Sequence, residues 1–171
     1  MERAWAEVPT HVRVNRWGSI GASLLVAALV LSLGRAGAAA QFRAVINPGV
    51  GIGPLTLGMR AMDVPRILQK EITPKIADDR VIYDVPSLGF TAWATDGYVV
   101  KIRTTSAMHK TPSGIHPGRI WNEGMLAMCG GMALTSDIPG GTEYTCPFAG
   151  IGFEVVRREI KGISVTRVRT R

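Results

Sequence analysis

The sequence lacks a long hydrophobic run and has only two cysteines. Its longest apolar stretch, residues 20–33, spans 14 residues, whereas a membrane-crossing helix needs about 20. No cysteine follows the small residues after this stretch, so a lipid anchor has no acceptor there. These absences argue against a transmembrane protein and against a lipoprotein.

Catalytic and metal-binding motifs are also missing. After residue 40 only His109 and His116 remain as histidines, and a zinc site needs three or four ligands. Asp78 and Asp79 are adjacent, so in a strand they would point to opposite faces, and no serine lies in a G-x-S-x-G motif. The glycine-rich run at 48–58 lacks the Lys-Ser/Thr pair and the immediate helix of a phosphate loop. We therefore predict no enzyme activity, no metal and no cofactor.

The N-terminus has the parts of a secretory signal peptide. Arg3, Arg13 and Arg16 precede the apolar stretch, and RAGAAA ends at Ala40. This order predicts a signal peptide over residues 1–40, cleaved after Ala40, and a secreted or periplasmic protein. An uncleaved anchor is the alternative. The remaining chain, 41–171, has 16 basic and 11 acidic residues, a net charge of +5.

The two cysteines, Cys129 and Cys146, both lie in the exported part. An oxidising compartment favours a disulfide between them. Reactive free thiols are the alternative, although the spacing is not C-x-x-C and no neighbouring motif indicates activation.

Residues 50–105 and 111–168 predict two copies of one unit. At an offset of 60, Leu55, Gly58 and Asp63 align with Ile115, Gly118 and Glu123. At an offset of 61, similar residues align throughout the later part, as follows: Tyr83 with Tyr144, Pro86 with Pro147, Gly89 with Gly150, Phe90 with Ile151, Ala92 with Phe153, Val99 with Ile160, and Ile102 with Ile163. One inserted loop residue accounts for the change of offset.

Each copy predicts a short helix followed by an antiparallel β hairpin or sheet. Pro65 prevents the first helix from beginning much before Ala61, and Gly130-Gly131 ends the second. Asp96-Gly97 predicts a two-residue hairpin turn. The predicted fold is therefore one pseudo-symmetric α+β domain over 41–171, with the helices packed on one face.

The hairpin also predicts a candidate partner surface. If Thr95 pairs with Tyr98, then Trp93, Tyr98, Val100 and Ile102 share one face, and Phe90, Ala92, Ala94, Val99, Lys101 and Arg103 share the other. Comparison with the second copy favours burial of the Phe90 face. We therefore predict a partner surface at Trp93, Tyr98 and Val100, with Trp121 as a second exposed aromatic residue. Packing of Trp93 between the two copies is the alternative, and a β-bulge near the turn would change the faces.

The order GIGPLTLGM, a short helix with an acidic residue and Ile67-Leu68, and strands joined at Asp-Gly resembles two groups of bacterial envelope modules. These are the SmpA/OmlA (BamE-like) outer-membrane assembly proteins and the β-lactamase inhibitor proteins, which are exported tandem repeats. Two features depart from that pattern: Arg60 stands where Ser or Thr usually caps the helix, and the inhibitor repeats are longer. The resemblance implies a non-catalytic, protein-binding module and transfers no target.

The predicted function is thus an exported, non-catalytic protein-interaction module with an unknown protein partner and no nucleic acid. Two alternatives stay open. One is a small envelope hydrolase whose site forms only in the fold. The other is a cell-wall or polyanion-binding protein that uses the basic C-terminal strand, where Arg157, Arg158 and Lys161 lie.

Overall fold

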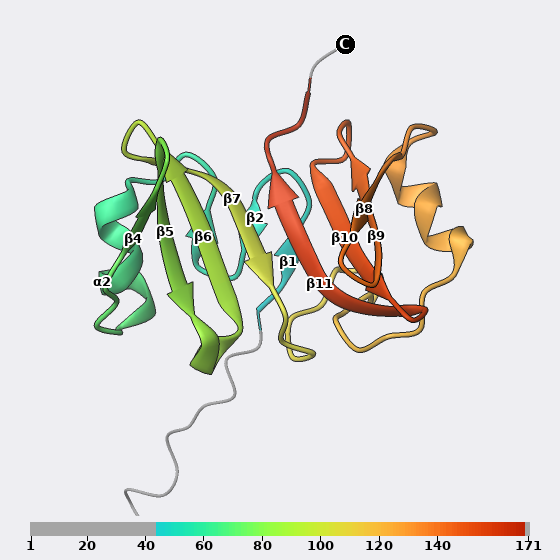
Figure 1. Ribbon diagram of the computed structural model, residues 1–171, viewed down its shortest axis with the longest axis horizontal. Helices are drawn as coiled ribbons and strands as arrows, with labels where there is room; N and C mark the ends of the chain where they lie inside the picture. The colour runs from blue at the N-terminus through green and yellow to red at the C-terminus, as the bar shows by residue number, and fades with distance from the viewer. Residues whose placement is uncertain (1–43, 170–171) are drawn as a thin grey trace, which may run out of the picture. The chain divides into compact units, whose positions relative to one another are not determined.

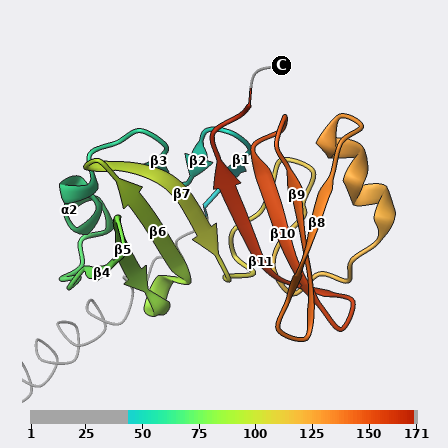
Figure 2. The ribbon, with the colours of Figure 1, turned by 45° about the horizontal axis from the view of Figure 1, so that its top comes forward.

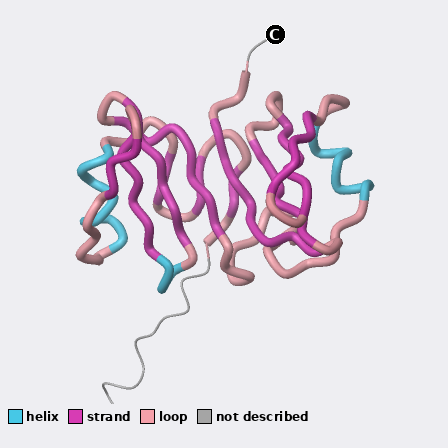
Figure 3. Tube along the Cα trace, viewed as in Figure 1, coloured by secondary structure: helices cyan, strands magenta, loops and turns pink. Residues whose placement is uncertain are grey.

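The computed structural model describes residues 44–169, so the predicted signal peptide at 1–40 lies outside the described residues. Two antiparallel sheets account for most of the regular secondary structure in this part of the chain (Figures 1 and 3). The small sheet has the order β1-β2-β3, and the large one has the order β4-β5-β6-β7-β11-β10-β9-β8. The strands are β1 (Ile46–Asn47), β2 (Gly51–Ile52), β3 (Leu55–Thr56), β4 (Lys75–Ala77), β5 (Arg80–Val85), β6 (Phe90–Thr95), β7 (Tyr98–Thr104), β8 (Leu134–Ile138), β9 (Gly141–Cys146), β10 (Ile151–Val156) and β11 (Glu159–Thr166).

The helical segments are short. They are the 3-10 helices η1 (Ala61–Asp63), η2 (Pro86–Leu88) and η3 (Glu123–Cys129) and the α-helix α2 (Val64–Leu68). Pro65 lies in the first turn of α2, and Gln69 ends it in the left-handed conformation with φ of 52°. Gly130 ends η3 in the same conformation with φ of 65°. Helix formation therefore stops after one or two turns in both places.

The predicted α+β class, with two helix-plus-hairpin repeats, is wrong. Residues 44–169 are mostly β, and their only α-helix is α2, with five residues. The edge strands β4 and β8 were not identified from the sequence, and each pairs with a strand that follows after a tight turn. Strands rather than helices therefore form most of the regular secondary structure.

The strand order divides the large sheet into two four-stranded halves that meet at β7 and β11. These two strands are antiparallel, with Ile102 opposite Val165 and Ile163 opposite Thr104. Each half also contains an equivalent backbone hydrogen bond from a glycine to its hairpin. Gly58 N–H donates to Val99 O, and Gly118 N–H donates to Ile160 O, both at 2.7 Å. Two stretches far apart in the sequence therefore approach their hairpins in the same way.

One face of the large sheet is covered. The small sheet packs behind the centre, where β2 contacts both β7 and β11. Figures 1 and 2 show α2 beside β4 at one flank and η3 beside β8 and β9 at the other. The two helical segments therefore lie at opposite flanks of the large sheet and do not pack against each other. The largest fully buried side chains are Phe90, Phe153, Ile46, Ile52, Leu55, Ile102, Ile151, Ile160, Ile163, His109, Val64 and Val99.

The predicted faces of the first hairpin are partly wrong, because a β-bulge changes which residues share a face. Thr95 pairs with Tyr98 as expected, but the register shifts between Trp93 and Ala94. Because the bulge adds one residue to β7, Ile102 joins the buried side and Lys101 turns to the other. Burial of Phe90 and Val99 is as predicted.

Cys129 and Cys146 form a disulfide with a Cα–Cα distance of 4.7 Å, which confirms the predicted pairing. The bridge joins the end of η3 to the end of β9. Within residues 44–169, no helix has the length and apolar character needed to cross a membrane.

Candidate functional site

An apolar groove of about 500 Å³ lies beside the β6–β7 turn. Its lining residues come from η1, β5 and the turn itself, and are Arg60, Ala61, Met62, Val81, Tyr83, Asp96, Gly97 and Tyr98. Met62 is 73% exposed and Tyr98 is 50% exposed. Two large and exposed side chains with apolar surface therefore meet at this groove, and grouped exposed apolar residues can mark a contact site.

Backbone hydrogen bonds fix the walls of the groove. Ala61 N–H donates to Gly97 O at 2.8 Å, and Val99 N–H donates to Met59 O at 2.9 Å. Arg60 also forms an isolated antiparallel bridge with Tyr98. The segment that carries Met62 is therefore held against the hairpin that carries Tyr98.

The edge strand β4 extends the apolar surface. Ile76 lies opposite Val81, which lines the groove, and Ile76 is 81% exposed. Neither Met62 nor Ile76 was predicted from the sequence. The pairing of β4 with β5, which was not predicted, is what brings Ile76 close to the groove.

The predicted surface residues do not form one patch. Tyr98 lines the groove, but Trp93 is half-buried, with Lys101 Nζ 5.4 Å from its ring centroid. Val100 is the half-buried residue at the bulge. The predicted exposure of Trp121 is wrong, because this residue is 8% exposed and stacks on Tyr144 with a centroid distance of 4.6 Å.

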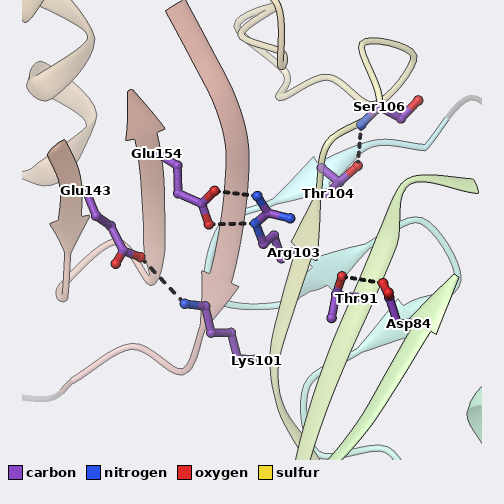
Figure 4. A network of polar contacts seen from close by, with 8 residues as sticks. All are labelled: Asp84, Thr91, Lys101, Arg103, Thr104, Ser106, Glu143 and Glu154. Carbon is purple, nitrogen blue, oxygen red and sulfur yellow. Dashed lines mark hydrogen bonds and ion pairs between the residues drawn. The ribbon is translucent and has the colours of Figure 1, made fainter. Parts of the chain in front are cut away.

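Two ion pairs lie on the other face of the large sheet (Figure 4). Arg103 on β7 binds Glu154 on β10 through two hydrogen bonds, Nε to Oε1 at 2.6 Å and Nη2 to Oε2 at 2.5 Å. These hydrogen bonds, and the negative charge of Glu154, raise the pKa of Arg103 although burial opposes the shift. The pair links the two halves of the sheet.

The Arg103–Glu154 pair crosses β11, which lies between β7 and β10. Gly162 on β11 leaves room for the pair in this arrangement. A Cβ atom at Gly162 would lie 2.8 Å from Glu154 Oε2 and 3.0 Å from Arg103 Nε, closer than carbon atoms normally approach such groups. A second ion pair, Lys101 Nζ to Glu143 Oε1 at 3.5 Å, runs beside it.

Two serines and a histidine line another pocket, of about 370 Å³. Ser87, Ser106 and His109 are among its eight lining residues, and none of the eight is acidic. His109 is 1% exposed, and its Nδ1 lies 2.6 Å from Thr104 Oγ1. Thr104 also accepts a hydrogen bond from the backbone N–H of Ser106. The carboxylate that would orient a histidine base in a hydrolase is not part of this pocket's lining.

The second histidine, His116, lies elsewhere, with Nδ1 2.7 Å from Pro117 O. Over residues 44–169, no group of three or more His, Cys, Asp and Glu side chains is placed to hold a metal ion.

Comparisons with known proteins give structural neighbours only. No family model matches the chain, and no curated protein matches it. The chain is similar in structure to the uncharacterized protein yfeY from Escherichia coli, with 13% identity and a TM-score of 0.49, covering 73% of this chain and 99% of that one. It is also similar to an extracellular protein containing an SCP domain from Bacillus anthracis, with 7% identity and a TM-score of 0.41, covering 65% of this chain and 44% of that one.

Proposed function

We propose that this chain is an exported, non-catalytic protein-interaction module that holds an apolar side chain of its partner in the groove beside Tyr98. The observation that carries the proposal is that exposed Met62 and Tyr98 line the groove and that exposed Ile76 lies opposite Val81, which also lines it. Tyrosine and tryptophan dominate binding hot spots because they combine a large apolar ring with a polar group.

Charge at the groove supports recognition of a peptide or protein surface. Arg60 and Asp96 carry opposite charges among the lining residues, and exposed charges near an apolar contact set its orientation and specificity. The disulfide agrees with an oxidising compartment. The signal peptide, the envelope or extracellular location and the likeness to SmpA/OmlA and inhibitor modules are parts of the same proposal.

Quantitative cross-linking on intact cells tests the groove. A photo-reactive residue at Met62 should capture one partner, and Tyr98→Ala should reduce that yield by about tenfold, the loss expected of a central aromatic contact. Leu134→Ala is the matched control, because Leu134 is also 50% exposed but lies on the edge strand β8. Equal yields from folded wild type and Tyr98→Ala would overturn the assignment of the groove.

Export has its own test. The N-terminal residue of the protein recovered from the envelope or the medium should be Gln41, as cleavage after Ala40 requires. A protein that retains residues 1–40 would contradict signal cleavage and leave the groove experiment unaffected.

A further inference from the structure

The β10–β11 turn places two arginines in a backbone conformation that arginine rarely adopts. Arg157 has φ of 51° and Arg158 has φ of 63°. The corresponding turn in the first half, Asp96-Gly97, has φ of 53° and 79°. Tight hairpin turns with two left-handed residues favour Asn, Asp and Gly, and strained residues concentrate at functional positions. The two arginines therefore need an explanation other than turn formation.

Their charges are not neutralised within the described fold. Both side chains are exposed, and neither forms an ion pair with another residue of 44–169. The next residue in the chain, Glu159, instead pairs with Lys161 at 2.8 Å. The turn consequently presents two unpaired positive charges to the solvent.

An exposed aliphatic residue lies next to this turn. Ile120 is 64% exposed and forms an antiparallel bridge with Glu159. The adjacent Trp121 N–H donates to Arg158 O at 2.8 Å, which fixes the segment beside the turn. Arg119, on the other side of Ile120, adds a third exposed cation. Cations around an exposed aliphatic side chain suit the interface of an anionic bilayer, where headgroups meet the charges and acyl chains meet the apolar group.

We propose that the β10–β11 turn, with Ile120, docks onto anionic lipid headgroups. A free polyanion would use the arginines but would gain nothing from Ile120. The surface is independent of the groove in the proposed function, because β7 and β11 are antiparallel and their starting ends, at Tyr98 and Glu159, lie at opposite ends of the sheet (Figure 1). The protein could therefore hold a partner at one end while the other end contacts the membrane.

Sedimentation with vesicles tests the proposal, using the protein as cells export it. Binding is expected to vesicles of phosphatidylglycerol and phosphatidylcholine, and not to phosphatidylcholine alone. Arg157→Asp/Arg158→Gly copies the turn of the first half. It should weaken binding by at least about 30-fold, since each cation contributes about fivefold near an anionic surface.

The same variant should raise the melting temperature by about 5 °C, because it relieves the backbone strain. Lost binding would then not be due to lost folding. Lys70→Asp/Lys75→Gly is the matched control: it makes the same change of charge in the first half and should leave binding within about twofold. Ile120→Ser should weaken vesicle binding about fivefold.

Three results would overturn the proposal. They are no binding to anionic vesicles, equal binding to vesicles of either composition, and unchanged binding by the turn variant. Binding to soluble polyphosphate as tight as to vesicles, with no effect of Ile120→Ser, would also reject a lipid ligand and identify a polyanion site instead.

Discussion

The two halves of the large sheet share a strand order but fill their cores differently. In the second half, Trp121 stacks on Tyr144, and Phe153 lies 5.4 Å from Trp121 between ring centroids. The corresponding positions of the first half hold Ala61, Tyr83 and Ala92. There Val64 and Leu68 of α2 contribute buried aliphatic side chains. The same backbone plan thus accepts an aromatic cluster in one half and smaller residues in the other.

The hairpin turns of the two halves differ as much as the cores. The first turn, Asp96-Gly97, borders the apolar groove, whereas the second, Arg157-Arg158, projects unpaired positive charge. Backbone hydrogen bonds at Gly58 and Gly118 are nevertheless equal in length. Main-chain pairing therefore sets the arrangement of strands in both halves. Side chains at equivalent positions make different contacts.

The largest expected effect is loss of the aromatic cluster. Trp121→Ala should lower the free energy of unfolding by about 3–5 kcal/mol, because it leaves a large cavity between Tyr144 and Phe153. Urea unfolding followed by circular dichroism measures the change. Trp121→Phe, which keeps a ring, should cost less than half as much. A change below about 1 kcal/mol for Trp121→Ala would show that the two cores do not differ in the way described.

The disulfide should have the next largest effect, and only the second half contains one. In the first half, the last residues of α2 and β5, which match Cys129 at the end of η3 and Cys146 at the end of β9, are Leu68 and Val85. Cys129→Ser/Cys146→Ser should lower the free energy of unfolding by about 3 kcal/mol, since the bridge closes a loop of 17 positions in the unfolded chain.

A reductant provides the control for the disulfide prediction. It should lower the stability of the wild type toward that of the double variant and leave the double variant unchanged. Equal stability of oxidised and reduced wild type would contradict the prediction.

The link between the halves should have a smaller effect. Glu154→Gln removes one charge of the pair with Arg103 and should cost about 1–2 kcal/mol, as for a charged hydrogen bond that is partly buried. Glu143→Gln is the control, because its pair with Lys101 is longer, at 3.5 Å, and should contribute about 0.5 kcal/mol or less. Equal losses of unfolding free energy in the two variants would show that the Arg103–Glu154 pair stabilises the fold no more than the Lys101–Glu143 pair.

The sequence predicted local features better than the fold class. Pro65 and Gly130 correctly limited the helical segments, and Asp96-Gly97 correctly identified a turn. The predicted fold class was wrong because it made helices a main part of the fold and omitted two edge strands. Strand β4 has only three residues, all exposed, and β8 is almost wholly exposed. Neither therefore has the alternation of apolar and polar residues by which a strand is recognised in a sequence.

The candidate site was predicted only in part, for two physical reasons. The bulge at Val100 reverses the faces of β7 beyond it, and an extra strand residue has no reliable signature in the sequence. The groove also depends on contacts between distant segments, as between Arg60 and Tyr98. Tyr98 could be selected as a single aromatic residue near a turn, whereas the arrangement of Met62 and Ile76 around it required the tertiary structure.

Gly162 has a consequence for how relatives of this protein should vary. Its bare Cα lets Arg103 and Glu154 meet above β11 although their strands are not neighbours. A side chain at this place would have to displace Arg103 or Glu154, so selection to keep both charged residues would weaken at the same time. Positions 103, 154 and 162 should accordingly change together across an alignment, as a correlated triplet rather than as two adjacent-strand pairs.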